Sequence, residues 1–130
     1  MSTSQEASAL QDYRRWEAWQ HAYDGTLAVY QLTGGFPRTE TYGLVAQMRR
    51  AAVSIISNIA EGAGRRSYAE LARFLDIARA SCVELECQLM LASDLGIGDA
   101  VAVTEARGTF DRVRRMLTSL SEVVRNQHGV

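Results

Sequence analysis

The chain has 130 residues, of which 47% are hydrophobic and 22% are charged, and its formal net charge is −1 at pH 7. This length and composition predict one domain with enough apolar material to bury a core. The near-neutral charge argues against a uniformly basic nucleic-acid binder, although local basic faces stay open. No apolar run reaches the ~20 residues that span a bilayer, so we expect no membrane partner.

The first residues, MSTSQEASALQDYRRW, are polar and acidic, and they lack the basic start and apolar core of a signal peptide. We therefore expect a cytoplasmic protein, and two reduced cysteines fit that compartment. Cys82 and Cys87 lie about 140° apart around one predicted helix, so they cannot pair with each other. Because Cys and His are too few for a metal site, we expect neither a metal nor another cofactor.

Helical periodicity runs along the whole sequence, with no convincing period-two strand pattern. The first predicted helix spans about residues 12–33, and Gly34-Gly35 ends it. Its apolar positions form a broad aromatic face, made of Trp16, Trp19, Tyr23, Leu27 and Tyr30. Core packing is the favoured use of the two tryptophans, and a subunit interface is the alternative.

The second predicted helix spans about residues 39–61, and Gly62 and Gly64 stop it. The third begins at Ser67, which forms a capping box with Glu70: hydroxyl and carboxylate each bond the backbone amide of the other residue. The third helix ends near residue 95.

The fourth predicted helix begins near Asp99 and carries an apolar residue at every third or fourth position, as in the seam of a helical bundle. These positions are Val103, Ala106, Phe110, Val113, Leu117, Leu120 and Val124. Four such helices with short turns predict an all-α, antiparallel up-and-down four-helix bundle. We place the bundle at residues 12–126, with a disordered N-terminal tail at 1–11 and a C-terminal tail at 127–130.

Polar residues three or four positions apart form a stripe on both the second and the third predicted helix, beside the apolar positions. The stripes comprise Gln47, Ser54, Asn58 and Glu61, and then Glu70, Arg73, Ser81, Glu84 and Gln88. With the turn at 62–66, the numbers of facing residues add to roughly 129, so that Gln47 lies near Ser81. Two interpretations stay open: a solvated face with local pairs, or a partly buried hydrogen-bond network that sets helix or subunit register.

Several short motifs between Tyr30 and Gly96 occur together in a fixed order. They are Phe36-Pro37, YGL (42–44), QMRRAA (47–52), SNIAEG (57–62), an Arg before the Ser67 cap, RFL (73–75) and ELECQL (84–89). This half of the chain closely resembles the four-helix-bundle family first noticed as open reading frames in intervening sequences of bacterial 23S ribosomal RNA. Each motif alone is weak, whereas their common order is specific.

The resemblance implies an all-α bundle that assembles into a ring-like homopentamer. A more distant resemblance links the chain to accessory bundle proteins of diversity-generating retroelements, which work with a reverse transcriptase and RNA. No enzymatic activity is established for the family, and its molecular role is unassigned. The implied partners are therefore further copies of the same chain and RNA or a nucleoprotein.

All fourteen basic residues are arginines, and their distribution is uneven: residues 38–79 carry a net +3, residues 80–105 carry −5 and residues 106–130 carry +3. The candidate nucleic-acid or anion contacts are Arg49, Arg50, Arg65, Arg66, Arg112, Arg114 and Arg115. In the alternative interpretation, the last three arginines pair with Asp111 or with acidic residues 84–105 of a neighbouring subunit.

Recognisable catalytic constellations are missing from the sequence. His21 and His128 lack the preceding Glu of a di-iron bundle site, and EGAGRRS lacks the Lys and the spacing of a phosphate-binding loop. We therefore expect no catalytic residues and a non-enzymatic, homo-oligomeric scaffold or binding module, associated with RNA or a nucleoprotein. The alternatives are a structural or protein-partner adaptor without nucleic-acid binding and, third, a small-molecule or anion-binding enzyme that uses the amides after Arg66.

Overall fold

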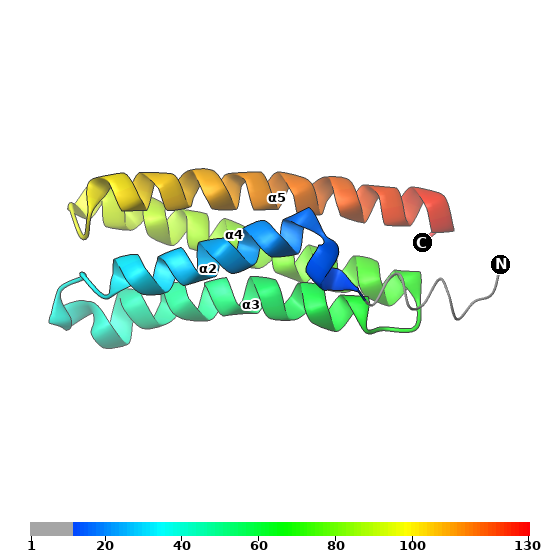
Figure 1. Cartoon of the computed structure of the whole chain (residues 1–130), viewed down its shortest axis with the longest axis horizontal. Helices are drawn as coiled ribbons and strands as arrows, with labels where there is room; N and C mark the ends of the chain where they lie inside the picture. Colours follow the sequence, from blue (N-terminus) through cyan, green and yellow to red (C-terminus); the bar gives the residue numbers. More distant parts are fainter. Residues whose placement is uncertain (1–11) are drawn as a thin grey trace.

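The computed structural model describes residues 12–130, so the tail expected at 1–11 lies outside the described residues. Four long helices run alternately up and down and are joined by short connections (Figure 1). They are α2 (Glu17–Thr33), α3 (Ala46–Ala63), α4 (Tyr68–Leu95) and α5 (Ala100–His128). The predicted antiparallel four-helix bundle is confirmed. Within residues 12–130, no helix combines the length and the hydropathy needed to cross a membrane.

The first helix begins later than its sequence suggests. A 3-10 turn, η1 (Tyr13–Arg15), precedes Trp16, whose backbone is extended with φ −74° and ψ 128°. The Gln20 side chain donates a 3.0 Å hydrogen bond back to the carbonyl of Arg14. This bond ties η1 to the first turn of α2, so that regular helix starts at Glu17 rather than near residue 12.

The entry into α3 is also irregular. It consists of a 3-10 turn, η2 (Arg38–Glu40), and a π turn, η3 (Thr41–Val45). The Glu40 carboxylate accepts a 3.4 Å hydrogen bond from the backbone amide of Leu44. Threonine and glycine in this segment are poor helix formers, so the regular helix begins at Ala46 rather than near residue 39.

The two glycines predicted to stop the second helix have different roles. Gly62 lies inside α3 and is buried, and a Cβ added to it would sit only 2.7 Å from Phe74 Cβ. This glycine therefore allows α3 to approach α4 closely. Gly64 is the C-cap, and its amide reaches the carbonyls of Ala60 and Glu61 at 3.2 Å.

Half of the predicted capping box forms at the start of α4. Ser67 Oγ accepts a 3.1 Å hydrogen bond from the backbone amide of Glu70. The Glu70 carboxylate does not complete the reciprocal bond in the described structure; it accepts a 3.3 Å hydrogen bond from Arg73 Nη2. A charged partner one turn away stabilises that carboxylate on the surface.

The last helix is longer than predicted. It continues to His128, two residues into the expected tail, and Gly129 ends it with φ +64°. The His128 ring stacks on Tyr68 with 3.4 Å between ring centroids and 4° between ring planes. This contact with the start of α4 gives the final turn of α5 a packing partner.

The apolar stripe of α5 is buried as predicted, with one change. Its buried members are Val103, Ala106, Phe110, Val113, Leu117 and Val124. Ser121 is buried and Leu120 is only half-buried. A straight α-helix drifts by ~20° per heptad relative to a strict seven-residue repeat. After several turns, Ser121 therefore faces the core in place of Leu120.

The aromatic face of the first helix lies mostly outside the core. The residues that α2 buries are mostly small, and they are Ala18, Ala22, Gly25, Thr26, Val29, Leu32 and Thr33. A Cβ added to Gly25 would lie 2.7 Å from Phe110 Cζ, so α2 approaches α5 closely through this small-residue face. Trp16 and Trp19 pack against the edge of the core, as favoured, but Tyr23, Leu27 and Tyr30 are exposed.

Candidate binding surfaces

The middle of the predicted polar stripes forms a hydrogen-bonded seam between α3 and α4. Ser54 Oγ and Ser81 Oγ lie 2.9 Å apart across the two helices. Asn58 Nδ2 donates to the Ser54 carbonyl at 2.8 Å and to Ser54 Oγ at 3.0 Å. All three side chains are half-buried. These three side chains therefore form a hydrogen-bond network between the two helices, which favours the network interpretation over a solvated face at this position.

Arg50 extends this α3–α4 seam toward the other end of the bundle. Its guanidinium pairs with Glu84 on α4 and donates a 3.1 Å hydrogen bond to Gln47 Oε1. Arg50 is one of the candidate nucleic-acid contacts, but it already forms an ion pair with a carboxylate of its own chain.

The last member of the α4 stripe has no such partner. Gln88 Oε1 is fully buried and has no hydrogen-bond partner among residues 12–130.

The predicted register between α3 and α4 is wrong by about one and a half turns. Ser54 faces Ser81 and Arg50 faces Glu84, so that facing numbers add to 135 and 134 rather than 129. The turn lies later than expected because α3 continues to residue 63. In addition, side chains lean toward the N-terminus of their own helix. In an antiparallel pair, two side chains that meet therefore come from positions slightly later in each helix, and the sum of their residue numbers is higher. Gln47 consequently lies away from Ser81.

Next to the α3–α4 turn, the ends of the stripes form local pairs on the surface instead of contacts between helices. Arg65 Nη2 lies 2.7 Å from Glu61 Oε1 within the α3–α4 connection, and Arg73 pairs with Glu70 along α4. Both guanidinium groups also lie over the Phe74 ring, at 4.8 Å for Arg65 and 4.7 Å for Arg73. The interpretation as a solvated face therefore holds at this end of the bundle.

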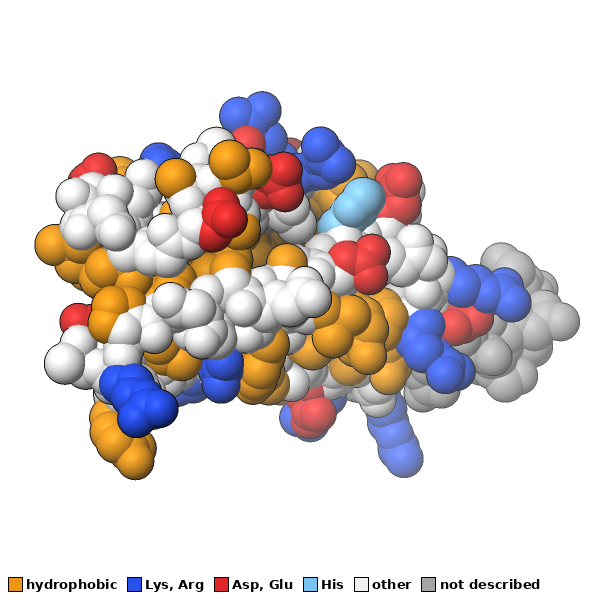
Figure 2. All heavy atoms as spheres, turned by 60° about the vertical axis from the view of Figure 1, so that its left-hand side comes forward, with side chains coloured by type: hydrophobic (Ala, Val, Ile, Leu, Met, Phe, Trp, Pro, Cys, Tyr) orange, Lys and Arg blue, Asp and Glu red, His pale blue; other side chains and the backbone are white. Residues whose placement is uncertain are grey.

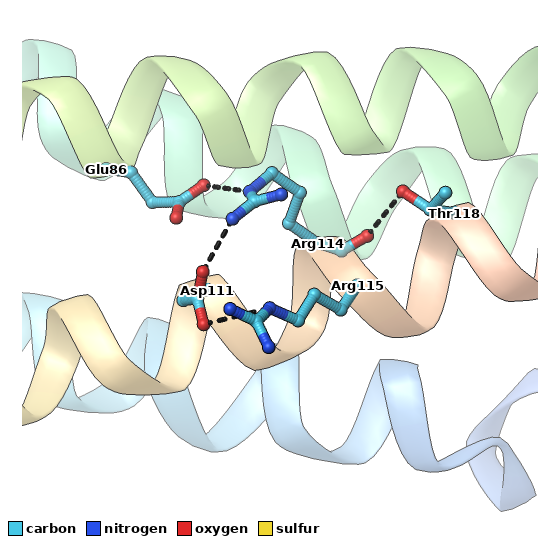
Figure 3. Close-up of polar contacts among 5 residues, drawn as sticks. All are labelled: Glu86, Asp111, Arg114, Arg115 and Thr118. Carbon is cyan, nitrogen blue, oxygen red and sulfur yellow. Dashed lines mark hydrogen bonds and ion pairs between the residues drawn. The ribbon is translucent and has the colours of Figure 1, made fainter.

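Arg114 holds α4 and α5 together (Figure 3). Its Nε lies 2.8 Å from Glu86 Oε2 on α4, and its Nη2 lies 2.5 Å from Asp111 Oδ1 on α5. The hydrogen bond to Glu86 and the charge of Glu86 raise the pKa of Arg114; burial opposes this rise, and Asp111 adds a smaller increase. Arg115 completes the group with Nε 3.2 Å from Asp111 Oδ2. These arginines therefore pair within the chain, which the alternative interpretation predicted for Asp111.

Arg49 is bound to the C-terminal end of α2. Its Nε donates a 2.9 Å hydrogen bond to Thr33 Oγ1, and its Nη2 donates one of 3.2 Å to the Tyr30 carbonyl. The guanidinium lies 4.6 Å from the centroid of the Tyr30 ring. A cation is favourable at a helix C-terminus, so this arginine stabilises the packing of α2 on α3.

Arg66 and Arg112 are the two candidate arginines that form neither an ion pair nor a side-chain hydrogen bond within residues 12–130. Arg112 lies 16 residues before His128, which stacks on Tyr68 near Arg66. At 1.5 Å per residue, about 24 Å along the bundle separates the two arginines. On the face in Figure 2, basic side chains stand in separate places with hydrophobic ones exposed between them. The seven candidates therefore do not form one continuous patch on a single chain.

One interhelical cluster has no counterpart among the sequence-based predictions. Asp76 on α4 accepts a 2.8 Å hydrogen bond from Ser121 and pairs with Arg125 at 2.5 Å, both on α5. The sequence signal that could have indicated this cluster is Ser121, which lies beside Leu120, one of the last apolar positions of the α5 stripe. A buried hydroxyl at a seam position requires a hydrogen-bond partner, which here is Asp76.

The two cysteines have different environments, and both are free thiols, in agreement with the prediction that they do not pair. Cys82 is fully buried, and burial raises its pKa to about 12, with a further rise from the charge of Glu86 and an opposing effect of Arg114. Cys87 is exposed.

An exposed apolar surface follows the outer side of α2, and we call Trp19, Tyr23, Leu27 and Tyr30 the aromatic ridge. Tyr23 is 42% exposed, Leu27 55% and Tyr30 44%. The Tyr23 ring stacks on Trp19 with 4.9 Å between centroids, and Arg49 covers one side of Tyr30. These contacts restrict the side chains, so the ridge is preorganised before it meets any partner.

A groove of about 800 Å³ runs along the outer side of α4 and α5. Its apolar wall consists of Val83, Cys87 and Met90 on α4, and Gly108 on α5 lies opposite. We call this the α4–α5 groove. Arg112 and Arg115 line a second groove of about 570 Å³, together with Trp16 and Met116.

The fold and these surfaces define a class of protein: a small four-helix bundle in which most polar side chains between the helices are paired. A family model described as 23S rRNA-intervening sequence protein matches residues 14–119. This span is more than half of the chain, and the chain belongs to that family, as its motifs predicted. A comparison with curated proteins gives no match.

Proposed function

We propose that this protein is a non-enzymatic, homo-oligomeric scaffold or binding module of the cytoplasm that associates with RNA or a nucleoprotein. The observation that carries self-association is the aromatic ridge. The opposite face of α2 already fills the core, yet three large side chains remain between 42% and 55% exposed on the outside. Contiguous exposed apolar side chains of this size are typical of a surface that binds a partner. The resemblance to the family implies a homopentamer.

Self-association is tested by native mass spectrometry of the protein at micromolar concentration. We expect one discrete closed oligomer, with five copies as the predicted number. Leu27→Asp should weaken the oligomer because it places a charge in the ridge, whereas Val123→Asp, at an exposed valine on α5, should not. A wild-type protein that is monomeric at this concentration would contradict the proposal.

The association with RNA is supported by Arg66 and Arg112, which have no ion-pair partner within residues 12–130. A closed oligomer repeats each of these charges in every copy. Phosphate contacts add to affinity steeply with their number, so repetition converts two weak contacts per chain into a strong site.

The test measures binding of a single-stranded RNA oligonucleotide by fluorescence anisotropy at several salt concentrations. For the wild type we expect affinity to fall with salt. For the double variant Arg66→Ala/Arg112→Ala we expect a shallower slope, by about one for each phosphate interaction that the substitutions remove. Arg65→Ala is the matched control, since Arg65 is paired with Glu61. No binding would favour the alternative adaptor that does not bind nucleic acid. Equal slopes for all three proteins would show that Arg66 and Arg112 do not contact phosphates.

A further inference from the structure

This inference rests on the proposed self-association and names the two faces that meet. A ring with more than two copies uses a heterologous interface, in which one surface of a protomer contacts a different surface of the next. The chain therefore needs two complementary surfaces. The aromatic ridge projects from α2, and the α4–α5 groove is a hollow between two other helices.

Gly108 indicates that the groove is a contact surface. It lies in the middle of α5, where glycine destabilises a helix by about 1 kcal/mol relative to alanine. A Cβ at Gly25 or Gly62 would come within 2.7 Å of a phenylalanine atom, but one at Gly108 would meet no atom within 4 Å. Packing inside the chain therefore does not require this glycine. Its missing side chain leaves room in the groove for a side chain from outside.

The exposed part of the ridge, from Tyr23 to Tyr30, matches the apolar wall of the groove in length. On the ridge, Tyr23 and Tyr30 are seven residues apart, with Leu27 between them. On the wall of the groove, Val83 and Met90 are also seven residues apart. Each span is about 10.5 Å along its helix, so two turns of the ridge fit beside two turns of the groove.

The charged side chains that lack a partner within residues 12–130 are complementary between the two surfaces. Arg79 and Arg107 line the groove, and neither forms an ion pair or a side-chain hydrogen bond with any residue in 12–130. Helix α2 contains no arginine or lysine, and its exposed Asp24 lies three residues before Leu27. Asp24 is likewise without such a partner in the described part of the chain. An acid beside the ridge thus matches the free cation of Arg107, next to Gly108 in the groove.

We propose that the aromatic ridge of one copy docks into the α4–α5 groove of the next copy, with Leu27 opposite Gly108 and Asp24 near Arg107. The occupant of the groove is a second copy of this chain.

Cys87 in the groove wall allows a direct test with one added thiol. Leu27→Cys in the full-length protein, treated with the mild oxidant diamide, should form disulfides with Cys87 of neighbouring copies and give a ladder of cross-linked species. Leu27→Cys/Cys87→Ser should lose the ladder, and Val123→Cys, with Cys87 intact, should give none. Cys82 is buried and does not react.

Cross-linking and native mass spectrometry together distinguish a wrong docking arrangement from a lack of self-association. An oligomer by native mass spectrometry without a Leu27→Cys to Cys87 disulfide would overturn the docking proposal and leave self-association standing. A disulfide between two Cys87 residues alone would overturn it in favour of a two-fold contact between α4 helices. A monomeric wild type would overturn both.

A charge exchange provides an independent check. Asp24→Arg should raise the protein concentration at which the oligomer dissociates by about tenfold or more, because it places like charges together. Adding Arg107→Glu to Asp24→Arg should restore assembly. Glu122→Arg, at an exposed acid on α5, is the control and should assemble normally. If Asp24→Arg assembles like this control, the proposed pairing is wrong.

Discussion

Helix α4 packs against α3 on one side and α5 on the other, and the two seams use different chemistry. The centre of the α3–α4 seam is neutral, with Ser54 bonded to Ser81, and Gly62 allows close approach. The α4–α5 seam is charged, with ion pairs from Arg114 to Glu86 and from Arg125 to Asp76. Short side chains allow α3 and α4 to approach closely. Long charged side chains connect α4 and α5, and a groove lies beside this seam.

The largest expected difference between the seams comes from one substitution made at two glycines. Gly62→Ala should destabilise the protein by about 2 kcal/mol, because the new Cβ overlaps Phe74 Cβ at the α3–α4 seam. Gly108→Ala should stabilise the monomer fold by about 1 kcal/mol, because the site is open and alanine favours helix. Urea denaturation of both variants measures the effect. If both variants changed the free energy of unfolding in the same direction, the assignment of Gly62 as the close-approach site would be contradicted.

The next effect concerns Cys82, which is buried near the α4–α5 ion pair. Its folded pKa of about 12 lies above the ordinary value of 9.0, so the unfolded thiol loses its proton first as the pH rises. Stability should therefore fall between pH 9 and about 12, and by pH 10.5 this group alone should remove about 2 kcal/mol.

The measurement is urea denaturation of the wild type and two cysteine variants at pH 8 and pH 10.5. Cys87→Ala should keep the wild-type loss of stability, because Cys87 is exposed. Cys82→Ala should show a smaller loss, whatever its stability at pH 8. If all three proteins lose the same stability, the buried thiol does not control this pH range.

A third, smaller effect tests the charged seam. Arg114→Met should destabilise the protein by about 1–2 kcal/mol, because Glu86 then keeps a half-buried charge without its partner. Arg115→Met is the matched control: its side chain is 75% exposed, so the change should stay within about 0.5 kcal/mol. Thermal or urea denaturation distinguishes the two, and similar values for both variants would contradict a specific role of Arg114.

The smallest effect tests the neutral seam. Ser81→Ala should cost about 1 kcal/mol by removing one hydrogen bond, and Ser54→Ala/Ser81→Ala should cost less than the sum of the two single variants. Ser57→Ala, at an exposed serine on the same helix as Ser54, should be within about 0.5 kcal/mol of the wild type. Strict additivity in the double-mutant cycle would show that the two hydroxyl groups do not interact.

The candidate surfaces were predictable only in part. The stripe containing Ser54, Asn58 and Ser81 follows from spacing, since residues three and four positions apart share a helix face. The partners of Arg50 and Arg114 do not follow from spacing. An arginine side chain is long enough to reach acids on a neighbouring helix, and periodicity does not say which acid it meets. The Asp76 cluster was not predictable because its members are 45 and 49 residues apart in sequence.

The sequence by itself determined the number and order of the helices and the buried face of α5. Hydrophobic periodicity and the Gly and Ser signals at helix ends depend on neighbours along the chain, so they can be read without tertiary contacts. Only the tertiary structure decided that α2 buries its small residues and exposes Tyr23, Leu27 and Tyr30. Both faces of α2 have helical spacing, and the close approach of Gly25 to Phe110 selects the one that turns inward.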